Sequence, residues 1–113
     1  MQLTASPTER TTAATDMLLS LTAAAGVVYL YGSQAVPSVR LQLWSWPLGL
    51  IAAAAALGAL YHGLILPAQV RRRLWQALTL LLAFALALFG VGIAYDLFGP
   101  EAARRGVIPA LAA

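Results

Sequence analysis

The only histidine of the sequence, His62, lies in an uncharged run between Pro47 and Pro67. An imidazole can form a hydrogen bond, ligate a metal or transfer a proton. Inside a membrane an ionisable group is costly, and it usually faces other helices or a cavity. Three interpretations therefore stay open for His62. They are a structural hydrogen bond, a ligand to the metal of a haem or chlorophyll-type pigment, and a catalytic or ion site.

Asp16 is the second residue whose chemistry stands out, because it lies about three turns after the helix-start signature Ser6-Pro7-Thr8-Glu9. That distance puts it beyond the range of a favourable helix-dipole effect. Counted from the ends of their runs, His62 lies about 7.5 Å inward and Asp16 about 9 Å inward on the same side. Thr79 lies at a similar depth in the last apolar run. The sequence therefore predicts a polar layer of Asp16, His62 and Thr79.

Small residues accompany the histidine. Ala54, Gly58 and His62 follow one another at a spacing of four and share one face of a helix. Small residues at this spacing let another helix or a flat ligand approach closely. We therefore predict that Ala54 and Gly58 form a helix-packing face beside the histidine.

The composition is that of a membrane protein. Of the 113 residues 61% are hydrophobic and only 10% are charged, and the mean hydropathy is +0.80. A soluble domain carries about 25% charged residues. We expect residues 1–113 to form a single membrane domain without a separate soluble catalytic unit. The chain has no cysteine, so disulfides and thiolate metal sites are excluded.

Three apolar runs are long enough to cross a bilayer as helices. The fold class predicted is therefore all-α integral membrane, with three transmembrane helices in a small bundle. Proline, glycine and arginine residues between the runs set the expected boundaries. The spans are predicted at about 7–31, 47–66 and 74–98, with an interfacial C-terminal tail over 99–113.

The first run also resembles a signal peptide, because Ser33-Gln34-Ala35 offers small residues at a cleavage site. Glu9 and Asp16 before and within the run favour an uncleaved span. The connection 32–46 contains Pro37, which breaks a helix, and two tryptophans. We expect this connection to lie in the membrane interface.

All seven basic residues are arginines, and three of them form the triplet Arg71, Arg72 and Arg73. Beside apolar spans, such a triplet in a short loop is typical of headgroup anchoring and orientation, and we expect no nucleic-acid partner. The expected location is the bacterial inner membrane, as a multi-pass protein with a cytoplasmic N-terminus. At the other side, Tyr95 and Asp96 close the last span near Arg40, as an interfacial pair.

Three short stretches carry a resemblance to a known group of proteins. They are TD at 15–16, GALYHG at 58–63 and LWQALTLLL at 74–82. Together, over residues 15–90, they resemble bacterial membrane proteins distantly related to the CREST superfamily, which includes alkaline ceramidases and adiponectin-receptor-like proteins. The resemblance implies the first three helices of a seven-span, metal-dependent hydrolase, with Asp16 and His62 as site-related positions. The other four spans and the remaining metal-binding histidines are absent.

The function expected from these observations is non-enzymatic: a small accessory or assembly subunit that packs against a larger membrane complex. An energy-transducing or photosynthetic complex is the expected host, with a haem or chlorophyll-type pigment on His62. The alternative is a CREST-like metal-dependent lipid hydrolase that forms its site only as an oligomer. The expected partners are the lipid bilayer and other membrane subunits or a second copy. The sequence carries no Walker loop, GxGxxG, HExxH or GxSxG motif.

Overall fold

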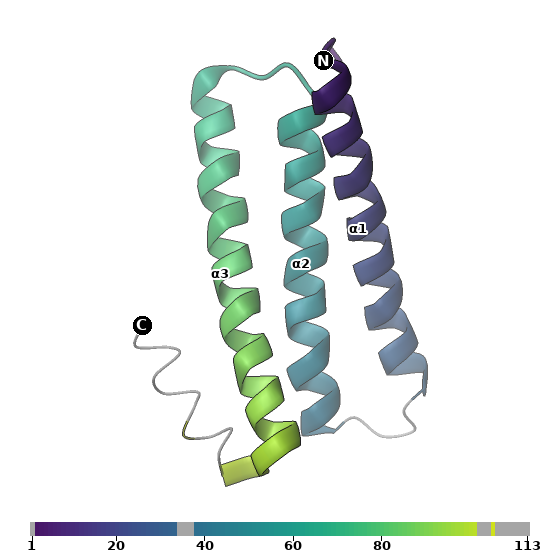
Figure 1. Ribbon diagram of the computed structural model, residues 1–113, viewed down its shortest axis with the longest axis vertical. Coiled ribbons are helices and arrows are strands. Elements are labelled where there is room, and N and C mark those ends of the chain that lie inside the picture. The colour runs from purple at the N-terminus through teal and green to yellow at the C-terminus, as the bar shows by residue number, and fades with distance from the viewer. Residues whose placement is uncertain (1, 34–37, 102–104, 106–113) are drawn as a thin grey trace.

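Three long helices make up the computed structural model, which describes residues 2–33, 38–101 and 105 (Figure 1). They are α1 (Pro7–Ser33), α2 (Val39–Gly63) and α3 (Ala68–Phe98). At 1.5 Å per residue they are about 40, 37 and 46 Å long, which exceeds the ~30 Å hydrocarbon core of a bilayer. All three are apolar enough to cross a membrane. The predicted all-α fold of three packed helices is confirmed, and the chain has the features of a multi-pass membrane protein.

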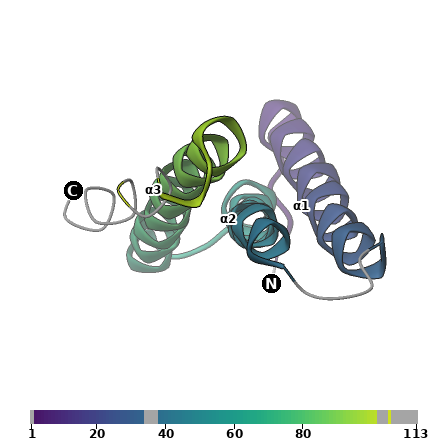
Figure 2. The same ribbon diagram turned by 90° about the horizontal axis from the view of Figure 1, so that it is seen from below.

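The helices form a row with α2 in the middle. Both α1 and α3 pack along α2, and within the described residues no Cα atom of α1 lies within 8 Å of a Cα atom of α3. Figure 2, which looks along the bundle, shows α1 and α3 diverging on either side of α2. The N-terminus and the connection between α2 and α3 lie at the same end of the row (Figure 1). We call this end the N-terminal end.

Helix α1 begins at Pro7, as the sequence predicts, because the Ser6 hydroxyl accepts a hydrogen bond from the Glu9 backbone N–H at 3.5 Å. It ends at Ser33, two residues later than expected. Residues 34–37, with Pro37 and most of the cleavage-like stretch, lie outside the described residues. The uncleaved first span therefore stays a prediction from the sequence, with the signal peptide as its alternative.

Helix α2 begins at Val39, eight residues before the predicted start of its span. The reason is Ser38, whose hydroxyl caps the helix by accepting from the Leu41 backbone N–H at 3.1 Å. Pro47 consequently lies inside the helix, where its side chain is fully buried. Membrane helices tolerate such a proline because neighbouring groups satisfy the backbone carbonyl that it leaves without a donor. The segment from 39 to 46, predicted as an interfacial connection, is helical.

Helix α2 ends at Gly63, three residues before the predicted end of its span. At this point the N-terminal segment pairs with the chain that follows the helix. The Thr4 N–H donates to the Gly63 carbonyl and the Ile65 N–H donates to the Gln2 carbonyl, both at 2.9 Å. These bonds satisfy one carbonyl that a helix end otherwise leaves without a partner. The chain beyond Gly63 is therefore extended, and the N-terminal segment covers this end of α2.

Helix α3 begins at Ala68, so the arginine triplet lies in its first two turns and not in a loop. Pro67 precedes the helix, and its carbonyl accepts the first helical bond from the Arg71 N–H at 3.0 Å. The helix ends at Phe98, where the sequence places it. Gly99 follows with φ +90°, a conformation that glycine adopts without steric strain.

The contact surfaces of the helices consist mainly of small residues. The Ser20 hydroxyl donates to the Ala52 carbonyl at 2.8 Å and joins α1 to α2 near the middle of α1. Ala54 and Ala85 are 3% and 2% exposed, so they lie inside the packed row. Large apolar side chains instead point outward, as expected where lipid replaces water. Among them are Leu18, Leu21, Val28, Phe84 and Leu86.

Candidate functional site

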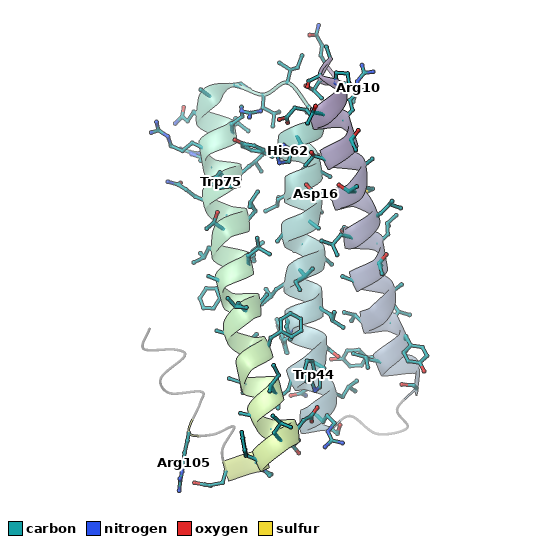
Figure 3. The ribbon with its side chains drawn as sticks, viewed as in Figure 1. Arg10, Asp16, Trp44, His62, Trp75 and Arg105 are labelled. Atoms are coloured by element: carbon teal, nitrogen blue, oxygen red, sulfur yellow. The ribbon has the colours of Figure 1, made fainter. Side chains whose placement is uncertain are left out.

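A groove of about 250 Å³ runs along α2 between α1 and α3. All three helices line it, with Thr12, Asp16, Leu19, Ile51, Ala54, Ala55, Gly58, His62, Trp75, Leu78 and Leu82. We call it the three-helix groove. Figure 3 shows Asp16, His62 and Trp75 on their three helices, nearer the N-terminal end than Trp44. The groove therefore brings together Asp16 and His62, together with the packing residues Ala54 and Gly58.

Thr79, the third residue of the predicted layer, lies elsewhere. Its side chain is exposed, and it lines a separate outer groove with Trp75, Gln76 and Leu80. Helix α3 is rotated so that Leu78 and Leu82 point toward α2. The sequence groups Thr79 with Asp16 and His62 only by depth along the helix axis, and for Thr79 this prediction is wrong. Equal depth does not fix the face of the helix on which a side chain lies.

His62 is paired with Glu9, a partner that the sequence reasoning missed. The Nδ1 atom lies 2.7 Å from the Glu9 Oε2 atom, and the side chains are 25% and 40% exposed. A neutral ring donates its Nδ1–H to this carboxylate, and a protonated ring forms an ion pair with it. The sequence places Glu9 only in the helix-start signature with Ser6. Glu9 lies seven residues before Asp16, so both acids lie on one face of α1. This spacing is the sequence signal that places Glu9 on the side of the groove.

Asp16 lies directly against the backbone of α2. A Cβ atom added to Gly58 would come within 2.6 Å of the Asp16 Oδ2 atom, so the carboxyl group occupies the space of a side chain at 58. Within the described part of the chain, Asp16 makes no hydrogen bond or ion pair. The structure thus brings Asp16 and His62 to one groove without a hydrogen bond between them.

Arg71, the first member of the arginine triplet, lies against Tyr61 of α2. Its guanidinium carbon lies 4.2 Å from the centre of the Tyr61 ring, and its Nη1 donates to the Tyr61 carbonyl at 3.2 Å. The Tyr61 ring also packs near Trp75 at 5.8 Å. Arg71 therefore joins α3 to α2, whereas Arg72 and Arg73 are exposed, and their binding to lipid headgroups stays a prediction.

At the opposite end, Asp96 joins α2 to α3. Its carboxylate accepts from the Arg40 Nε at 2.9 Å and from the Trp44 Nε1 at 3.0 Å. The Trp44 ring lies against Gly92, where an added Cβ would come within 3.3 Å of it. The expected proximity of Asp96 to Arg40 is confirmed, and Trp44 is an additional partner. This cluster lies far from the three-helix groove (Figure 3).

A haem or chlorophyll-type pigment would bind His62 through Nε2, the ring nitrogen that does not face Glu9. Metal-bound histidines commonly donate their other ring N–H to a carboxylate, which is the arrangement that Glu9 provides. The groove volume, about 250 Å³, is below the ~300–1,000 Å³ of pockets for drug-sized ligands. A tetrapyrrole on His62 would therefore extend beyond the groove toward lipid or a neighbouring protein. The pigment stays a prediction.

A complete metal site is a separate question. Among the described residues, no group of three or more His, Cys, Asp and Glu side chains is arranged to hold a metal ion. Hydrolysis of the CREST type would therefore need ligands from a second copy of the chain.

Comparisons with known proteins give one match. No curated protein and no solved structure matches the chain significantly. The comparisons show no link to the CREST superfamily, so hydrolase roles for Asp16 and His62 stay an expectation. The sequence model of a family described as "Family of unknown function (DUF6962)" matches residues 11–113, which include every lining residue of the three-helix groove. The chain therefore belongs to this family of unknown function.

Proposed function

We propose that the protein is a small accessory subunit of a larger membrane complex and that it receives a transmembrane helix of its partner in the three-helix groove. The observation that carries this proposal is the groove itself. It lies along α2 between α1 and α3, whose backbones stay more than 8 Å apart, Cα to Cα, in the described part of the chain. Ala54, Ala55 and Gly58 form the buried floor of the groove, so a partner helix would contact its exposed wall residues, Leu19 on α1 and Leu82 on α3.

The polar groups of the groove support a protein partner over lipid alone. Asp16 lies six residues after Arg10, about 9 Å further along α1, and acyl chains at that depth would offer its carboxyl group no hydrogen bond. Intramembrane carboxyl groups typically face other helices or a cavity. The expected host stays an energy-transducing or photosynthetic complex, since His62 with its Glu9 partner is suited to hold a pigment metal.

A matched pair of leucines on α3 tests the proposal. Leu82 lines the three-helix groove, whereas Leu80 lies on the outer face, and both are exposed, at 47% and 59%. Leu82→Trp should reduce the partner retained on the purified native complex about tenfold, because an overfilled contact costs about 1–3 kcal/mol. Leu80→Trp should retain it. Partner content is measured by quantitative mass spectrometry of the complex in mild detergent. Equal retention by both variants would contradict the proposal.

The second candidate is a metal-dependent lipid hydrolase formed by two or more copies. The observation in its favour is the placement of Asp16 and His62 on one groove. In that case hydrolysis of membrane lipids by the purified oligomer should stop on chelation and in both Asp16→Asn and His62→Gln. A purified oligomer with no chelator-sensitive hydrolysis would rule this candidate out.

A further inference from the structure

The partner's chemistry follows from Asp16, provided that the proposed function holds. Asp16 is half-buried on the groove wall, and its carboxyl group lies against Gly58. The nearest ionisable group of the groove is His62, and its Nδ1 atom is already bonded to Glu9. The hydroxyl of Thr12, one turn before Asp16, donates to the Thr8 carbonyl of its own helix. No described residue therefore pairs with the Asp16 carboxyl group, which is available to a group outside this chain.

From these contacts we infer that the partner's transmembrane helix carries an arginine or a lysine at the depth of Asp16 and pairs it with this carboxylate. An ionisable group inside a membrane typically pairs with a group of opposite charge. A basic side chain at that depth equally requires an acid. The pair would fix both the depth and the rotation of the partner helix in the groove.

A second copy of this chain does not supply such a group. The seven arginines lie at positions 10, 40, 71–73, 104 and 105, and the chain has no lysine. Every arginine that the structure describes lies at or near an end of a helix or beyond one. A two-fold dimer that joined groove to groove would place one Asp16 opposite the other. Like charges repel in that arrangement, so charge complementarity favours a different protein.

Lipid does not supply it either. Phosphate and amine headgroups lie at the membrane surface, where Arg72 and Arg73 are exposed. Asp16 lies about 9 Å along α1 beyond Arg10, the last charged residue before it. An acyl chain in the groove would leave the carboxyl group without a partner. A basic side chain on a protein helix reaches this depth because the helix itself crosses the membrane.

The experiment uses the complete chain in its native membrane, with a photo-crosslinking side chain in place of Leu19. This groove residue lies three positions after Asp16. Three variants are compared with the otherwise unchanged crosslinking chain: Asp16→Asn, Asp16→Glu and Met17→Asn. Asparagine keeps the size of the Asp16 side chain but removes its charge. Met17 is 49% exposed and does not line the groove, so Met17→Asn controls for an amide in the span.

The inference expects a crosslinked peptide from an apolar helix with an arginine or lysine within one turn of the crosslink. Asp16→Asn should reduce the crosslinked partner at least about tenfold, because it leaves the partner's charge unpaired. Asp16→Glu and Met17→Asn should retain it. Asp16→Lys combined with replacement of the partner's basic residue by aspartate should restore crosslinking. That exchange keeps the test decisive if a single variant folds poorly.

Two results overturn the inference. One is a crosslinked partner helix without a basic residue near the crosslink, and the other is full retention of the partner by Asp16→Asn. Both leave the proposed accessory function intact, because a partner is still present in the groove. A chain with unchanged Asp16 that crosslinks only to lipid, or only to its own copies, contradicts the accessory function itself, and the inference with it.

Discussion

Replacing Gly58 by leucine is expected to destabilise the folded chain by about 1–3 kcal/mol, the usual range for overfilling a packed contact. The physical reason is the 2.6 Å separation between a Cβ at position 58 and the Asp16 Oδ2 atom. Gly58→Ala should have the same sign and a smaller size, since the Asp16 side chain can rotate. The measurement is reversible unfolding of the purified chain in detergent, followed by circular dichroism.

A control and a rescue separate this clash from ordinary glycine effects. Gly49 lies in the same helix with no atom within 4 Å of an added Cβ. Gly49→Ala should therefore stabilise α2 by about 0.5–1 kcal/mol, as alanine does in a helix interior. In an Asp16→Ala background the clash is absent, so Gly58→Ala should also become stabilising. A stabilising Gly58→Ala with Asp16 still present would show that the two helices are not this close.

The second large effect concerns Glu9 and His62. Single changes Glu9→Ala and His62→Ala should each destabilise the chain, because each removes one partner of the 2.7 Å hydrogen bond. In a double-mutant cycle the two changes should be coupled by about 1 kcal/mol, within the range of interhelical polar pairs in membranes. The bond joins α1 to α2 at the N-terminal end, so its loss should also loosen the pairing of Thr4 with Gly63.

The matched comparison is the cycle of Asp16→Ala with His62→Ala. Both residues line the groove, and no hydrogen bond joins them in the described structure. Their coupling should therefore be smaller than that of Glu9 with His62. The sequence alone predicts Asp16 and His62 in one polar layer, because the two lie at similar depth. A larger coupling for Asp16 than for Glu9 would contradict the structure.

The sequence predicts the fold well because bilayer thickness alone constrains it. A run without charge that is long enough to cross the hydrocarbon has to be helical, since its backbone finds no water there. The ends of the helices were harder to predict. Pro47 looked like a start, but Ser38 caps α2 eight residues earlier. The arginine triplet looked like a loop, but Pro67 begins α3 before it.

The candidate site was predictable only in part. The cost of an ionisable group in a membrane identified Asp16 and His62, and the four-residue spacing identified Ala54 and Gly58. The rotation of each helix about its own axis was not predictable, because nearly every face of these helices is apolar. That rotation decides that Thr79 points outward. It also turns Glu9 toward His62, although the local capping pattern offered Glu9 another partner.

The most direct test of the account asks what lies in the three-helix groove in the native membrane. A photo-crosslinking side chain is placed at Leu82, inside the groove, and in a second sample at Leu80, on the outer face of the same helix. The accessory-subunit account predicts that Leu82 crosslinks to one transmembrane helix of another protein, whereas Leu80 crosslinks mainly to lipid. Lipid adducts alone at both positions, or a protein adduct at Leu80 and none at Leu82, would contradict it.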